Sequence, residues 1–269
     1  MKAGIVLDST LDVTDELRDK VYWVPLKVEL AGQIFHDGTK TTDEIFQIMR
    51  EKNTFAKTSQ PAPIEFEKVY EKVLREHEFV ISIHISEKLS GTVESARMAA
   101  ERFKERVFVF DTGAATIVAQ KYVEKALQMK DEKPEKILKE LERLKAGMHL
   151  FLTVGSLEFL KRSGRLKGME VMIGSLLRLR PVIEVVEGAL KTRKIIRGDA
   201  RLLSYMKKLL QEFKGDILMG NIHAPEKSQQ LYKEAKKLGR NVLEIPVRSC
   251  ALSVHLGPGS YGIAIFENV

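Results

Sequence analysis

The 269-residue sequence contains a single cysteine, Cys250, and no long apolar run. One cysteine excludes both an internal disulfide and a multi-cysteine metal site, so we expect a free, buried thiol. No apolar stretch approaches the roughly 20 residues that a membrane-spanning helix needs. The opening residues, MKAGIVLDST, have the pattern of a β-strand and lack that of a signal peptide. We therefore expect a cytoplasmic protein without a transmembrane segment.

Motifs for nucleotides and metals are also missing. The sequence has neither a Walker loop nor G-x-G-x-x-G, and the turn Gly257-Pro258-Gly259 contains a proline without the N–H that a phosphate would need. Four histidines lack the paired spacing of zinc ligands, and no carboxylate cluster accompanies them: His84, His149, His223 and His255. We expect no metal, and no cofactor beyond a bound ligand.

The composition is that of a globular protein with a substantial core, since 44% of the residues are hydrophobic and 30% are charged. A chain of this length suggests one large domain or two of moderate size. A change of pattern near Gly147 predicts a boundary there, which gives two domains of residues 1–147 and 148–269.

The net charge of +7 is concentrated in one segment. Residues 161–201 hold eleven basic and four acidic residues, and eleven minus four accounts for the whole excess. The basic residues are Lys161, Arg162, Arg165, Lys167, Arg178, Arg180, Lys191, Arg193, Lys194, Arg197 and Arg201. Such a segment suits nucleic acid, an acidic protein or a phosphorylated ligand, and a merely solvated basic face fits equally well.

Strands and helices alternate along the first half of the chain. Apolar, β-rich runs at residues 4–7, 79–85 and 107–110 are separated by helical periodicity, which predicts a mostly parallel sheet with right-handed crossovers. The second half predicts strands at residues 149–153, 182–186, 190–197, 217–223, 241–245 and 263–266, and a very apolar helix at 169–179. The predicted fold class is therefore α/β in both domains.

Three polar loops follow the predicted parallel strands, namely Asp8-Ser9-Thr10, Ser86 to Thr92 and Asp111-Thr112. Ligands of such sheets bind beyond the carboxyl ends of the strands, so these loops should share one crevice. A helix is predicted to start near Gly91, where unpaired N–H groups suit an oxygen anion. An ordinary N-cap by a neighbouring hydroxyl explains the same residues.

A catalytic triad of Ser90, His255 and Asp8 is conceivable, which keeps a serine esterase or acyl-transfer enzyme open as an alternative. The G-x-S-x-G nucleophile elbow is absent, however, and hydroxyl residues are common. His255 fits equally well as a hydrogen-bonded histidine that stabilises the following turn. Hydroxyls and an imidazole are also suitable donors for a small carboxylate.

Seven short motifs occur in the order and spacing of the DegV family, which nearly the whole chain resembles. They are Asp8-Ser9-Thr10, Lys57-Thr58-Ser59-Gln60-Pro61, Leu89-Ser90-Gly91-Thr92 with Ser95-Ala96, Asp111-Thr112, Ser163-Gly164-Arg165, Arg197-Gly198 and His255-Leu256-Gly257-Pro258-Gly259. Each motif is weak alone, whereas the ordered set is specific.

The resemblance implies a bacterial fatty-acid-binding protein whose two α/β domains enclose an acyl chain in a tunnel between them. Residues that match Thr58, Ser90 and His255 hold the carboxylate in this family, with weaker transfers to Ser59, Gly91 and Arg165. Asp8-Ser9-Thr10 would buttress this pocket. The expected tunnel wall is Ile81, Ile83, Met169, Met172, Ile173, Leu176 and Leu177, although residues 169–177 fit plain core as well.

Some members of this family present the fatty acid to a separate fatty acid kinase, which makes an acyl phosphate. The resemblance therefore implies a non-catalytic lipid-binding subunit, in keeping with the missing ATP motif. The family's kinase-contacting arginine matches Arg197, and Arg193 lies on the same predicted hairpin as a second partner-binding residue. Nucleic-acid binding by residues 161–201 stays open as an alternative.

Overall fold

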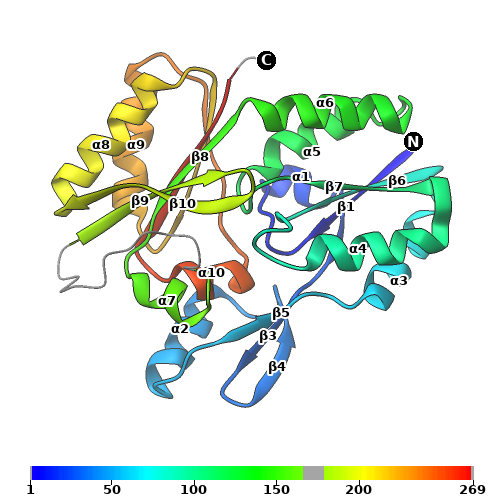
Figure 1. Cartoon of the computed structure of the whole chain (residues 1–269), viewed down its shortest axis with the longest axis horizontal. Coiled ribbons are helices and arrows are strands. Elements are labelled where there is room, and N and C mark those ends of the chain that lie inside the picture. The colour runs from blue at the N-terminus through cyan, green and yellow to red at the C-terminus, as the bar shows by residue number, and fades with distance from the viewer. Residues whose placement is uncertain (1, 166–178, 268–269) are drawn as a thin grey trace.

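The computed structural model describes residues 2–165 and 179–267, which fold into three β-sheets with flanking helices (Figure 1). Two sheets form the centres of two α/β units. The third is a small antiparallel sheet that lies below both units in Figure 1. The predicted α/β class is confirmed.

The first sheet has the strand order β2-β1-β6-β7, and all its neighbouring strands are parallel, as the sequence predicted. Val6 of β1 packs with one group of helices, whereas Ile5 and Leu7 pack with the other. Because both faces are buried, these strands have continuous apolar runs. The strands are β1 (Ala3–Asp8), β2 (Tyr22–Val24), β6 (Phe79–His84) and β7 (Val107–Asp111).

Helices cover both faces of the first sheet (Figure 1). One face packs against α3 (Pro63–Val73) and α4 (Thr92–Ala100), which a 3-10 segment, η1 (Glu101–Arg106), follows. The other face packs against α1 (Asp15–Arg18), α5 (Ala119–Gln128) and α6 (Pro134–Ala146).

The second sheet has the order β10-β9-β8-β13-β11-β12, and its pairs are antiparallel except β11 with β12. One face is covered by α8 (Asp199–Glu212) and α9 (Pro225–Lys237). The strands predicted at residues 217–223 and 241–245 are present as β11 and β12, which pair in parallel and are connected through α9. The strands are β8 (Met148–Thr153), β9 (Leu179–Val186), β10 (Ala189–Arg197), β11 (Asp216–Ile222), β12 (Val242–Glu244) and β13 (Ser260–Phe266).

The third sheet was not predicted. Its order is β4-β3-β5, from β3 (Lys27–Leu30), β4 (Gln33–His36) and β5 (Lys57–Ser59). Residues 22–30 form two strands and not one, because Pro25, which has no N–H for a sheet, separates β2 from β3. The sheet and α2 (Thr42–Glu51) share a hydrophobic cluster with α7 (Leu157–Arg162) and α10 (Cys250–Leu256) of the second unit.

The two units share one continuous core. Ile81 and Ile83 of the first sheet belong to the same buried cluster as Leu150 and Leu152 of the second. The predicted boundary at Gly147 falls between α6 and β8, and we retain the division 1–147 and 148–269 as a proposal, with residues 27–59 packed on the second unit.

The most apolar helix predicted from the sequence cannot be compared with the structure. The apolar helix predicted at 169–179 lies outside the described residues, apart from Leu179, which begins β9. Within residues 2–165 and 179–267, no helix has the length and apolar character needed to cross a bilayer.

Candidate ligand-binding site

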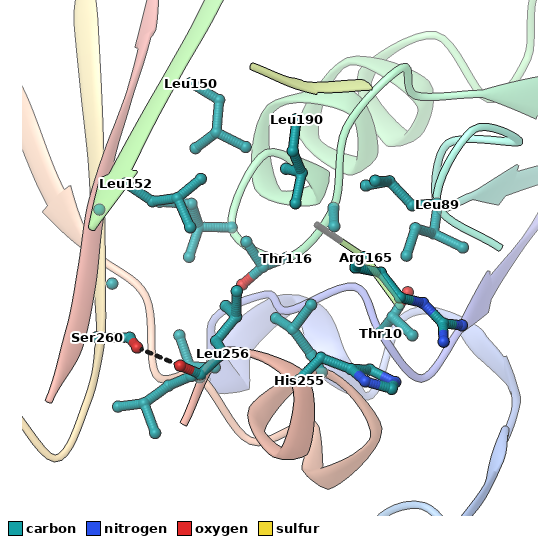
Figure 2. A pocket seen from close by; sticks show the side chains of 18 of the residues that line it. Thr10, Leu89, Thr116, Leu150, Leu152, Arg165, Leu190, His255, Leu256 and Ser260 are labelled. Carbon is teal, nitrogen blue, oxygen red and sulfur yellow. Dashed lines mark hydrogen bonds between the residues drawn. The ribbon is translucent and has the colours of Figure 1, made fainter. Parts of the chain in front are cut away.

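A pocket with mostly aliphatic walls lies where the two units and the small sheet meet (Figure 2). The lining residues surround about 950 Å³ of space that holds no atoms of the protein, and this figure includes open solvent at the mouth. The aliphatic lining residues are Leu26, Ile85, Leu89, Ala115, Ile117, Leu150, Leu152, Leu160, Val185, Leu190, Ile222, Val247, Ala251, Leu252 and Leu256.

One side of this pocket is polar. Figure 2 shows Thr10, Arg165 and His255 together on that side, with Leu150 and Leu152 opposite. Thr58 and Ser90 also line the pocket. These five residues come from the loop after β1, from β5, from the loop before α4, from the turn after α7 and from α10. The structure thus brings together four predicted ligand-binding residues, Thr58, Ser90, Arg165 and His255.

His255 is neutral at pH 7 and has one ring nitrogen unused. Burial, helped by the positive charge of Arg165, lowers the pKa of His255 to about 4. Its Nε2 lies 2.7 Å from Thr58 Oγ1, so these two groups share one hydrogen bond. Its Nδ1 is buried and has no hydrogen-bond partner among the described residues. Since buried polar atoms are rarely left unpaired, Nδ1 is available to a ligand.

Arg165 provides a positive charge at the same side. It is half-buried, and burial lowers the pKa of its guanidinium, although an arginine stays charged in a protein. Nη1 donates to the Ser163 carbonyl at 2.6 Å, and no carboxylate of the described residues pairs with it. A partly desolvated cation without a counter-ion favours an anionic group nearby.

Ser90 and Gly91 lie at the start of α4. Ser90 Oγ is 2.8 Å from Thr92 Oγ1, and Gly91 is the N-cap residue without a side-chain cap. A Cβ on Gly91 would overlap the side-chain amide of Gln60, and that amide donates to Ser95 Oγ at 3.0 Å. Gln60 therefore holds the chain after Thr58 against the helix start.

A shallower polar hollow adjoins the head-group side. It shares Leu89, Ser90, Arg165 and Leu190 with the pocket and adds residues at the surface, among them Lys88 and Gly91. The polar end of the pocket is therefore close to solvent. Ser59, in contrast, is exposed and lines neither space, and its contact with the ligand stays a prediction.

Asp8 lies behind the polar side, where it bonds to Thr10 and Ile85, two residues that line the pocket. Its buried carboxylate accepts hydrogen bonds from Thr10, from the Ile85 N–H at 2.9 Å and from His84 Nδ1 at 3.1 Å. His84 Nε2 lies 2.6 Å from Ser82 Oγ. Asp8 is thus paired with His84 and not with His255. Since Ser90 and His255 also have other partners, the hydrogen bonds of the structure do not assemble the conceivable triad.

The tunnel wall differs from the prediction. Ile81 and Ile83 are fully buried in the core and do not line the pocket, because the pocket lies beyond the carboxyl end of β6, where Ile85 and Leu89 contact it. Met169, Met172, Ile173, Leu176 and Leu177 lie outside the described residues.

The sequence did not identify the opposite wall. Leu150 and Leu152 alternate on β8, while Val185 and Leu190 flank the tip of the hairpin of β9 and β10. The spacing of two along β8 marks these residues as one face of a strand. It does not distinguish a face that packs in a core from a face that lines a cavity.

Several basic side chains of residues 161–201 form ion pairs within the protein. Arg193 donates to Glu184 at 2.9 Å and to Glu212 at 2.8 Å, and its role in binding a partner stays a prediction. Arg162 and Arg180 also pair with carboxylates. Arg197, at the end of β10, is exposed and makes no ion pair with the described residues. No cluster of His, Cys, Asp and Glu within the described ranges could hold a metal ion.

The fold and the pocket define a class of protein: two α/β units around an apolar pocket with one polar, cationic side. The family model described as "Uncharacterised protein, DegV family" matches residues 2–268. The chain belongs to the DegV family.

Relatives and solved structures agree with this family. A DegV domain-containing protein of Deinococcus radiodurans is 30% identical over 276 residues, covering 98% of each chain. A fatty-acid-binding DegV family protein from Thermus thermophilus has a TM-score of 0.92 at 36% identity, covering 100% of both chains. A stearic-acid-binding protein from Eubacterium ventriosum has a TM-score of 0.86 at 26% identity, covering 99% of this chain and 98% of its own.

Proposed function

We propose that this protein binds one long-chain fatty acid, with the acyl chain in the apolar pocket and the carboxylate at Thr58, Ser90, Arg165 and His255. The observation that carries the proposal is the polarity of the pocket. Its walls are mostly aliphatic, whereas one side combines hydroxyls, an imidazole nitrogen and an arginine, neither of which has a polar or acidic partner among residues 2–165 and 179–267 except for the carbonyl of Ser163.

Burial of the acyl tail provides a large favourable free energy of binding. A tail of about 16 carbons has a gross transfer free energy near 12 kcal/mol at about 0.8 kcal/mol per CH₂. The loss of ligand freedom reduces this considerably. A buried carboxylate is tolerated only when several donors surround it, and the polar side supplies such donors. The tail therefore provides affinity, and the head-group residues fix the orientation.

Binding is tested by titrating the delipidated protein with palmitic and stearic acid at pH 7.4. A Thr58→Ala/His255→Ala double variant should bind at least tenfold more weakly than the unmodified protein. A Thr54→Ala/His36→Ala double variant is the matched control, because both residues lie outside the pocket, and it should bind normally. Equal affinity for all three proteins would refute the assigned head-group site.

We further propose that this protein carries the fatty acid to a separate kinase and does not itself catalyse a reaction. The polar hollow beside Ser90 and Arg165 adjoins the proposed carboxylate site, so a carboxylate bound there would be near solvent and within reach of a separate kinase in the cytoplasm. The resemblance to carriers of this type and the exposed Arg197 support such a partner.

Presentation to a kinase is tested by reconstitution with a fatty acid kinase and ATP, with acyl phosphate as the product. Arg197→Ala should reduce product formation at unchanged fatty-acid affinity. Lys191→Ala, another exposed cation on β10, is the control. Unchanged product formation by Arg197→Ala would remove Arg197 from the contact. Product made without any kinase would contradict a non-catalytic role.

A further inference from the structure

Two buried carboxylates lie outside the pocket, at the start of the helix that carries His255. Asp12 is 2% exposed and Asp37 is 6% exposed. Asp12 follows the first strand of the first unit, and Asp37 follows β4 of the small sheet. Both meet the first residues of α10 in the second unit.

Asp12 joins two segments that line the pocket. Its Oδ1 accepts from the Arg248 N–H at 2.8 Å and from the Ser249 N–H at 3.4 Å. Its Oδ2 accepts from Thr116 Oγ1 at 3.0 Å. Thr116 itself lines the pocket in the first unit. One carboxyl group therefore fixes the distance between Thr116 and the start of α10.

Asp37 holds the same helix start from the small sheet. Its Oδ1 accepts from the Cys250 N–H at 2.8 Å, and its Oδ2 accepts from Ser249 Oγ at 2.7 Å. Ser249 Oγ in turn accepts from the Leu252 N–H at 3.0 Å, as an N-cap does. The first turn of α10 is thus attached to both other parts of the protein.

The last turn of this helix forms the head-group side of the pocket. α10 has only seven residues, a length of about 10 Å at 1.5 Å per residue. Ala251, Leu252, His255 and Leu256 all line the pocket. A helix this short moves as one body, so a displacement of its first turn displaces His255. We propose that Asp12 and Asp37 are positioning residues that hold His255 against Thr58 and thereby set fatty-acid affinity.

Neighbouring groups affect the charge of both carboxyl groups. Asp37 faces Asp12, and Cys250 faces both. The Arg248 guanidinium points elsewhere, since its Nη2 donates to Asp15 at 2.7 Å. Burial raises the pKa of Asp12 to about 7 and also raises the pKa of Asp37. No cation of the described residues forms an ion pair with Asp12, so an asparagine of the same shape can replace it.

The test compares Asp12→Ala, Asp12→Asn and, as the matched control, Asp15→Asn, whose side chain is 80% exposed and contacts the same Arg248. Fatty-acid affinity should fall at least tenfold in Asp12→Ala, and it should stay within about threefold of the unmodified protein in Asp12→Asn and the control. Should Asp12→Ala fail to fold, Asp37→Ala takes its place, because it removes the other carboxyl group that holds the same helix start.

A second readout needs no ligand. Histidine-selective NMR follows the titration of His255, whose pKa is lowered to about 4 by its buried position. Asp12→Ala should move this pKa toward the ordinary value of 6.5, and Asp12→Asn should restore it. An unchanged His255 titration together with unchanged affinity in a folded Asp12→Ala would overturn the proposal.

The inference rests on the proposed function for its affinity readout only. If the unmodified protein binds no fatty acid, the proposed function fails, and the His255 titration still decides whether Asp12 positions the histidine. If the protein binds fatty acid but Asp12→Ala leaves both readouts unchanged, the positioning role fails alone.

Discussion

The pH dependence of stability should reveal two opposing buried titrations, those of Asp12 and His255. The pKa of Asp12 is raised from 3.8 to about 7 and that of His255 is lowered from 6.5 to about 4. Between about pH 4 and 6.5 the folded state therefore holds a proton on Asp12 that the unfolded state lacks. Over the same range the unfolded state holds a proton on His255 that the folded state lacks. In the unmodified protein these two contributions should nearly cancel.

The sign of each contribution follows from its shift. A raised pKa on Asp12 gives stability that is present below pH 3.8 and is lost as the pH rises through about 7. The size is up to about 4 kcal/mol, at 1.36 kcal/mol per pKa unit. The lowered pKa of His255 gives stability that is present above pH 6.5 and is lost as the pH falls through about 4, up to about 3 kcal/mol.

Single substitutions should expose each contribution. Relative to the unmodified protein, Asp12→Asn should gain stability progressively as the pH rises from 4 to 7, because only the histidine contribution remains. His255→Gln should show the opposite slope. The assay is urea unfolding of the delipidated proteins at half-unit steps from pH 4 to 8, with Asp15→Asn as the control. A stability difference between Asp12→Asn and the unmodified protein that is constant over this range would refute the assigned protonation of Asp12.

Three further predictions concern single side chains. Thr58→Val removes the hydroxyl that is hydrogen-bonded to His255. It should weaken fatty-acid binding by about 10- to 100-fold, since a hydrogen bond to a charged group contributes about 1.5–3 kcal/mol. Thr58→Ser keeps the hydroxyl and should bind fatty acid normally in the same titration. Gly91→Ala should displace Gln60, because the added Cβ meets its amide, and should weaken binding several-fold; normal binding would show that this contact is dispensable. Thr192→Val should raise the free energy of unfolding, measured with urea, by about 1 kcal/mol, because the Thr192 hydroxyl is buried without a partner among the described residues. A lower free energy of unfolding would contradict this and indicate that the hydroxyl has a hydrogen bond to another group.

The first sheet and part of the site were predictable from local sequence. The apolar runs that became β1, β6 and β7 define parallel strands because both of their faces are buried. The loops after β1 and β6 contribute Thr10 and Ser90 to one pocket, as the topology requires. Thr112 does not join them, since its hydroxyl bonds within its own turn, to the Ala114 carbonyl at 3.0 Å.

The remaining features depend on contacts between distant segments. β5 has only three residues, too few for a period of two to be visible. Its Thr58 nevertheless forms a hydrogen bond with His255, which lies 197 positions further along the chain. The bond from Arg248 to Asp12 spans 236 positions. Nothing in the local pattern at Asp12 distinguishes a buried acceptor from an ordinary turn residue, because both favour aspartate.

The most direct test of the central claim is the identity of whatever ligand the protein carries after purification. Native mass spectrometry of the intact protein, followed by organic extraction, measures both stoichiometry and chemical identity. We expect one fatty acid per chain, which is lost in the Thr58→Ala/His255→Ala double variant and retained in the Thr54→Ala/His36→Ala control. A protein that is empty, and that takes up no added palmitic or stearic acid, would contradict the fatty-acid-binding function.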